Sequence, residues 1–221
     1  MNLSEILFER LQELILPADY PAGEIVPIEK QLCGTAFFPL GEGILEAGKW
    51  KQDEHYPMMV LAQDCGNEAR ANEVFASTLQ SELAYGNTTW INLEKLLGKE
   101  AMKDCFFTTA IMGLRKGAQK DDQASYAFST KGKDFLQLNL SFFKEQLETA
   151  DPDVIIALGL PVVHFLSAIF TREMHAFKEL KSLKALESFC PKGYIDIIRD
   201  GNPLRIVFIT KPKQKLKELI N

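Results

Sequence analysis

Four short apolar runs are the most regular feature of the hydrophobic pattern. They lie at 58–62, 105–111, 153–159 and 204–210. None of them alternates cleanly between apolar and polar residues, which is typical of strands that are covered by other elements on both faces. We therefore expect four buried strands.

Stretches with the period of an amphipathic helix lie before and between these runs. We expect one helix that ends before Pro17, and further helices over 67–83, 90–97, 135–149, 161–170 and 175–189. Strands that alternate with helices of this length pair in parallel through right-handed crossovers. The pattern predicts an α/β fold, a three-layer α/β/α arrangement around a central, mostly parallel four-stranded sheet.

The length of 221 residues and the 46% hydrophobic content fit a single domain over 1–221 with one sizeable core. Residues 17–57 are rich in proline and glycine, with only short apolar pieces between them. This composition is typical of loops. We expect 1–57 to form an N-terminal helix and loop extension of the domain.

Charge is distributed unevenly along the chain. The net charge is −5, yet residues 205–221 alone carry +4, which leaves −9 for residues 1–204. A second positive stretch, "MGLRKGAQK", occupies 112–120. Both stretches are typical of solvated surfaces, and both also fit a partner that carries phosphate, because phosphate binding depends on concentrated positive charge.

The cysteines stand singly, with no C-x-x-C pair, which argues against a zinc ribbon and a disulfide scaffold. The three histidines form no metal-binding pattern, so we expect no metal and no cofactor. No apolar stretch approaches the length of a membrane span, and "MNLSEILFER" lacks the features of an export signal. We expect a cytoplasmic monomer with no membrane association.

Four polar or glycine-containing segments follow the four runs directly. They read "QDCGN", "MGLRKG", "GLPVV" and "KPKQK". In sheets of this class the ligand binds beyond the carboxyl ends of the strands. The residues that carry the chemistry are therefore expected in these segments.

The same segments resemble motifs of the uracil-DNA glycosylase superfamily. "VLAQDCGNEA" is similar to its first motif, a strand followed by a G-Q-D-P-Y-H or G-E-A-P-G turn, with Ala62 for the first glycine and Cys65 for the proline. "CFFTTAIMGLRKG" resembles its second strand, and "FFKEQLETADPDVIIALGLPVVHFL" its helix, strand and next helix. "VFITKPKQKL" lies where the family has a strand that ends in H-P-S or H-P-A. The resemblance spans about residues 58–215.

The resemblance implies two catalytic residues. Asp64 matches the aspartate of the Q-D form of the first motif, which is thought to position water and to offset positive charge on the sugar. Lys211 stands where the family has the histidine of its last motif, and its ammonium group could stabilise an anionic base oxygen. Two alternatives stay open, because Asp64 could cap the following helix and Lys211 could be a solvated lysine.

The resemblance also implies a pocket for a flipped base. Gln63, Gly66 and Asn67 belong to the turn itself, and Phe75 lies about where the family places its base-stacking phenylalanine. The alternative for Phe75, an ordinary core aromatic of the helix expected over 67–83, stays open. Thr109 aligns with the base-reading asparagine, and its single hydroxyl cannot present the paired donor and acceptor of an amide.

Together these features predict a divergent DNA glycosylase that hydrolyses the N-glycosidic bond of a damaged or deaminated base. Arg115, Lys116, Lys213 and Lys215 are the expected contacts to the DNA backbone. The changes at Cys65, Thr109 and Lys211 leave open an inactive relative that only binds nucleic acid or a nucleotide-like ligand. An acidic protein partner for the basic C-terminal segment is a third possibility. The four-cysteine pattern of the family's iron-sulfur branch is absent.

Overall fold

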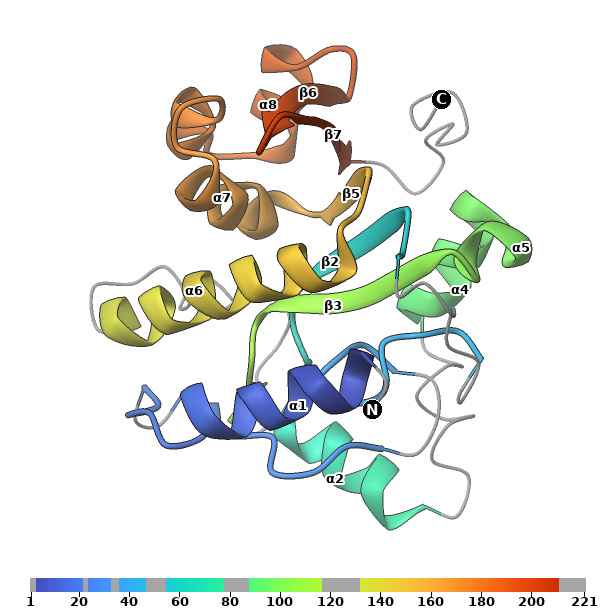
Figure 1. The fold of residues 1–221 in the computed structure, drawn as a ribbon, viewed down its shortest axis with the longest axis vertical. Coiled ribbons are helices and arrows are strands. Elements are labelled where there is room, and N and C mark those ends of the chain that lie inside the picture. The colour runs from blue at the N-terminus through green and yellow to red at the C-terminus, as the bar shows by residue number, and fades with distance from the viewer. Residues whose placement is uncertain are drawn as a thin grey trace.

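The computed structural model describes residues 3–21, 24–32, 36–46, 55–77, 88–116 and 132–210. A five-stranded sheet in the order β3-β2-β5-β7-β6 forms its centre (Figure 1). The strands are β3 (Cys105–Ile111), β2 (Met58–Asp64), β5 (Val154–Leu158), β7 (Asn202–Ile209) and β6 (Tyr194–Arg199). The first four run parallel, and β6 pairs antiparallel with β7. The four expected strands and their mostly parallel pairing are thus confirmed.

The sheet has five strands and not the expected four, and the additional strand is β6, which the hydrophobic pattern did not predict. Among its six residues only Ile197 is buried, and Asp196 interrupts its apolar residues. Among the described strands, β6 lies at the edge of the sheet and pairs with β7 alone. An edge strand of this kind does not need the continuous apolar run by which the other four were found.

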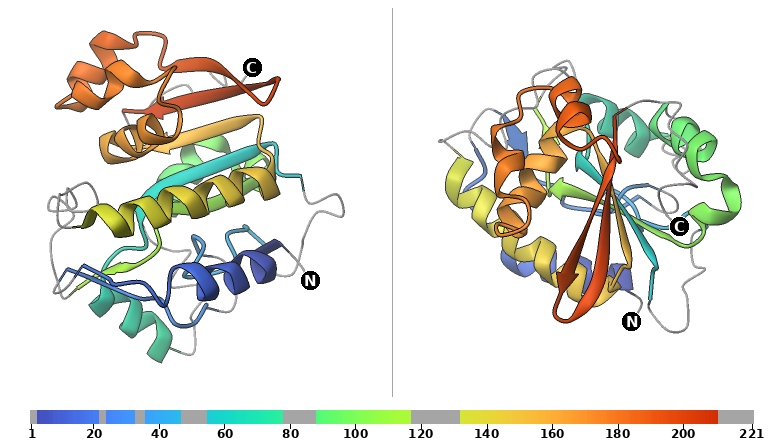
Figure 2. Two further views of the ribbon diagram at one scale, coloured as in Figure 1. Left: turned by 60° about the vertical axis from the view of Figure 1, so that its left-hand side comes forward. Right: turned by 90° about the horizontal axis from the view of Figure 1, so that it is seen from above.

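Helices cover both faces of the sheet, which confirms the three-layer arrangement. Their bounds are α1 (Leu3–Leu14), α2 (Glu68–Ala76), α4 (Thr88–Leu97), α5 (Lys99–Met102), α6 (Lys133–Ala150), α7 (Leu160–Ile169) and α8 (Leu183–Phe189). In the view from above, α4 and α5 lie on one side of the sheet, and α1, α6 and α7 lie on the other (Figure 2). None of the helices in the described part of the chain is long and apolar enough to cross a membrane.

Two helix predictions are wrong at their boundaries. Ser77 is extended (φ −83°, ψ 146°), so α2 ends at Ala76, and the rest of the expected helix, 78–83, lies outside the described residues. The expected helix over 175–189 is split into a 3-10 helix, His175–Glu179, and α8. The second piece starts where the Ser182 side chain accepts a hydrogen bond from the backbone N–H of Ala185 (3.1 Å).

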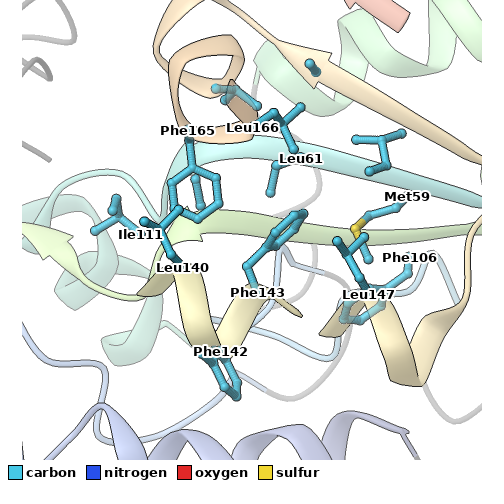
Figure 3. Packing of buried hydrophobic residues seen from close by; sticks show 14 of the residues in the cluster. Met59, Leu61, Phe106, Ile111, Leu140, Phe142, Phe143, Leu147, Phe165 and Leu166 are labelled. Atoms are coloured by element: carbon cyan, nitrogen blue, oxygen red, sulfur yellow. The ribbon is translucent and has the colours of Figure 1, made fainter. Parts of the chain in front are cut away.

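The larger part of the core lies between the sheet and the α6–α7 layer. Met59 and Leu61 of β2 and Phe106 of β3 meet Phe143 of α6 and Phe165 of α7 there (Figure 3), and none of these five residues is exposed. On the other face, a smaller cluster joins β2, β3 and α4 and includes Val60, Phe107 and Trp90. Alternate residues of β2 therefore face opposite layers, as the pleat of a strand requires.

The N-terminal extension packs directly on the edge of the sheet. The N–H of Phe38 donates to the carbonyl of Phe107 (2.9 Å), and the N–H of Phe107 donates to the carbonyl of Gly43 (2.7 Å). A short two-stranded sheet ties β1 (Ile25–Val26) to β4 (Leu114–Arg115), the segment that follows β3. The extension thus reaches the loops at the carboxyl ends of β2 and β3.

Candidate functional site

A cavity of about 310 Å³ opens beside the carboxyl end of β2. Asp64 at the end of β2 and Cys65 and Gly66 in the turn after it contribute to its wall, and β4 contributes Arg115. Other walls come from α2, from the first turn of α4 and from the N-terminal extension. The cavity lies at the position expected for a ligand site in a parallel sheet, and its size is at the lower end of small-molecule pockets.

Strand parity decides which side chains of the first motif reach this cavity. Ala62 and Asp64 line it, on the face of β2 that carries Val60. Gln63 lies between them in the strand and does not line it, because successive side chains of a strand point to opposite faces. The predicted base contact of Gln63 therefore has no support from the geometry of the cavity.

Gly66 and Arg115 both hold the carboxylate of Asp64. Its Oδ1 accepts the backbone N–H of Gly66 (2.9 Å). Arg115 Nε lies 3.3 Å from each of its two oxygens. The two side chains are only 10% (Asp64) and 11% (Arg115) exposed. This is an ion pair that solvent reaches only in part.

Helix capping is the task of Asn67 and not of Asp64. Asn67 is the N-cap of α2, and its Oδ1 accepts the N–H of Arg70 (2.9 Å). The alternative reading of Asp64 as the cap is therefore wrong. Asn67 lines the cavity next to Arg70, which pairs with Glu73 (2.7 Å).

Gly66 gives the turn its shape. Its φ of +87° lies in the region that favours glycine. Its carbonyl accepts the N–H of Arg115 (2.8 Å), while the N–H of Cys65 donates to the carbonyl of Gly113 (3.4 Å). The turn after β2 and the segment after β3 are thereby joined through their backbones.

Thr109 lies beneath the turn and does not line the cavity. It is fully buried, its hydroxyl donates to the carbonyl of Ile111 (3.1 Å), and the same oxygen lies 3.3 Å from Cys65 Sγ. The pKa of the Cys65 thiol is raised to about 12, mainly by burial; the hydrogen bond with Thr109 lowers it and the charge of Asp64 adds a smaller rise. The thiol stays protonated at neutral pH, so Cys65 offers no thiolate nucleophile.

Among the residues that the structure describes, two aromatic residues line the cavity, and neither is Phe75. Phe75 packs in small clusters beside the cavity, with Lys30 Nζ 4.9 Å from its ring centre. Phe37 from the extension and Trp90 from α4 form the aromatic wall, with ring centres 5.0 Å apart. Trp90 is only 1% exposed, whereas Phe37 is half-buried, so Phe37 offers the accessible ring. Sequence reasoning missed both, since the extension carries no motif and Trp90 reads as a core position of its helix.

The predicted basic residues fall into three different situations. Arg115 is paired with Asp64, and Lys116 next to it is exposed. Lys211, Lys213 and Lys215 lie outside the described residues.

A second hollow of about 250 Å³ lies between α4 and the ends of β5 and β7, with Leu158 and Thr210 in its wall. Within the described ranges, no group of three His, Cys, Asp or Glu side chains is placed to hold a metal ion.

Comparisons with known proteins add no family to this picture. No protein-family model matches the chain, and no curated protein is significantly similar to it in sequence. The function must therefore be argued from the cavity and from the motifs at the strand ends.

Proposed function

We propose that the protein is a divergent DNA glycosylase that holds a single flipped base in the cavity beside Asp64 and hydrolyses its N-glycosidic bond. One observation carries the proposal: the cavity combines a largely buried carboxylate, Asp64, with an accessible aromatic ring, Phe37. An enzyme that acts on a base must remove it from the stack and hold it against an apolar or aromatic surface. Phe37 supplies such a surface.

Asp64 supplies the charge that this reaction needs. Breaking the bond between base and sugar leaves positive character on the sugar and negative charge on the departing base. A fixed carboxylate next to the sugar favours this separation more than it favours the intact substrate. The Gly66 N–H and Arg115 hold the Asp64 carboxylate in one place, so little reorganisation is required when the charge develops.

A second candidate is a protein that binds the base without cleaving the nucleotide. It is favoured by the ion pair itself, because the guanidinium of Arg115 compensates part of the negative charge that Asp64 would offer to the sugar. The absence of Thr109 from the cavity wall also removes the position that corresponds to the family's base-reading asparagine. Binding without chemistry would use the same cavity and the same aromatic ring.

The test uses labelled single-stranded and duplex oligonucleotides that carry uracil, hypoxanthine, xanthine or a mismatched base. Alkali after incubation reveals abasic sites as strand breaks. We expect breaks with at least one substrate, and a rate about 10²- to 10³-fold lower for Asp64→Asn, the usual cost of removing one electrostatic group that acts in the transition state. Asp151→Asn, which changes an exposed carboxylate at the C-terminal end of α6 that does not line the cavity, serves as the matched control.

Two results would contradict catalysis by Asp64. If Asp64→Asn cleaves as fast as the parent protein, the carboxylate has no part in the reaction. If no substrate is cleaved but the same oligonucleotides are retained in a salt-sensitive manner, the second candidate is correct.

A further inference from the structure

We propose that Arg115 is a positioning residue for the carboxylate of Asp64, and does not contact the DNA backbone. The proposal rests on the proposed function, since it concerns the same cavity and the same reaction. The two neighbouring cations of "LRKG" then have different roles: Arg115 is largely buried against Asp64, whereas Lys116 is exposed to solvent.

The contact between the two side chains is the first argument. Arg115 Nε is equally close, at 3.3 Å, to both oxygens of Asp64, so it constrains the direction of the whole carboxylate group. Both partners are about nine-tenths buried. A phosphate contact requires a guanidinium that reaches solvent, whereas the Nε of Arg115 contacts Asp64 and its Nη1 is buried.

The backbone around Arg115 is the second argument. Its N–H donates to the carbonyl of Gly66 (2.8 Å), which belongs to the same turn as Asp64. On its other side, Arg115 pairs with Ile25 in the short sheet of β1 and β4. The backbone of Arg115 is thus held by hydrogen bonds on both sides, which fixes the position of its Cα and limits where its side chain can reach.

A buried amide fixes the segment one step further back. Asn139 of α6 is fully buried, and its Oδ1 accepts the N–H of Met112 (2.7 Å) while its Nδ2 donates to the carbonyl of Phe135 (2.7 Å). The segment that carries Arg115 therefore leaves β3 along a path set by the core. An arginine held in this way can fix Asp64 to the accuracy that catalysis demands.

Kinetics on the cleaved substrate separate positioning from DNA contact. Arg115→Gln is expected to lower kcat by about 10²-fold, the cost of a misplaced catalytic group, with KM nearly unchanged, because the carboxylate acts in the transition state and not in binding. The affinity of Arg115→Gln for DNA should fall with salt concentration at the same slope as that of the parent protein. Arg115→Lys, which keeps the charge but not the planar group, should recover only part of kcat.

Arg10→Gln is the matched control. It also removes one arginine whose Nε contacts a carboxylate, that of Glu145 (3.0 Å), but on α1, away from the cavity. We expect it to leave kcat and KM unchanged. The proposal is overturned if Arg115→Gln raises KM at constant kcat and reduces the salt slope by about 0.9, the change expected for one lost phosphate contact. Full recovery of kcat in Arg115→Lys also contradicts it.

A measurement without substrate keeps this test independent of the proposed function. Urea unfolding of the parent, Arg115→Gln, Asp64→Asn and the double variant forms a cycle that measures the pairing itself. Arg115→Gln alone should shift the unfolding equilibrium about a hundredfold, because it leaves a buried carboxylate uncompensated, and much less when Asp64 is already Asn. Additive effects would overturn the pairing even if the protein cleaves DNA. A strong coupling without any cleavage would leave the pair intact and refute the glycosylase alone.

Discussion

The protonation of Cys65 gives the sharpest quantitative test of the chemistry at the turn. Its sulfur lies 3.3 Å from Thr109 Oγ1 on the buried side of the turn. Burial is the main cause that raises its pKa from 9.0 to about 12. At pH 8 a thiol with a pKa of 9.0 is about one-tenth thiolate, whereas Cys65 should be thiolate in only about one molecule in 10⁴.

Alkylation measures this difference directly. Because iodoacetamide reacts with the thiolate, we expect Cys65 in the folded protein to react about a thousandfold more slowly at pH 8 than in the urea-unfolded chain. Peptide mass spectrometry at timed intervals separates Cys65 from the other cysteines. The rate should also keep rising about tenfold per pH unit above pH 9, where an ordinary thiol levels off. A rate that levels off near pH 9 would refute the reasoning, because steric protection alone does not move the pKa.

The same rise in the pKa of Cys65 makes the free energy of unfolding depend on pH. The folded state keeps its proton between pH 9 and pH 12, while the unfolded state releases it, so the free energy of unfolding falls as the pH rises through this window. From pH 8 to pH 10 the loss amounts to about 1.4 kcal/mol. Cys65→Ala should lack this part of the loss in urea unfolding at the two pH values. An equal loss in parent and variant would show that Cys65 is not its source.

Two further predictions concern the shape of the turn and the aromatic wall. Gly66→Ala should lower the free energy of unfolding in urea by about 1–2 kcal/mol, because its φ of +87° is unfavourable for alanine although no atom lies within 4 Å of the added Cβ; an unchanged midpoint would contradict this. Phe37→Leu should weaken the binding of an oligonucleotide with a flipped base about tenfold or more, since stacking of a base on an aromatic ring contributes about 1–3 kcal/mol. If Phe75→Leu weakens binding more than Phe37→Leu in the same gel assay, the assignment of the stacking ring is wrong.

The location of the candidate site could be predicted from the sequence, since apolar runs reveal the strands and a parallel sheet gathers their carboxyl ends. Asp64, Gly66 and Arg115 were found in this way, although 51 residues separate Asp64 from Arg115. Their ion pair could not be predicted, because it depends on the path of the chain after Ile111. The positive charge of this stretch predicted an exposed Arg115, but in the structure Lys116 is the exposed residue of the two.

Two other misses share one physical cause, the path of the N-terminal extension. Thr109 pairs with Ala62 and shares a face with Phe107, so strand parity alone would place it on the cavity face. Its burial depends on the extension, because the Phe38 carbonyl lies 3.3 Å from its Oγ1. The position of Phe37 has the same origin. Its place in the wall depends on how the extension pairs with the edge of β3, through Phe38 and Gly43. Long-range backbone pairing of an irregular segment leaves no period in the sequence.

The central position of β2 has a consequence for the newly made chain. Met58 pairs with Cys105 on one side and with Val154 on the other, 96 residues later. Ribosomes add about 5–20 residues per second, so about 5–20 s pass between the synthesis of β2 and that of β5, its second partner strand. Its apolar residues Met59, Val60 and Leu61 stay open to wrong partners during that time. The newly made chain should therefore depend most on chaperones while residues 65–158 are being translated. Synonymous codon changes that slow the translation of this stretch should lower the yield of folded protein without changing its final stability.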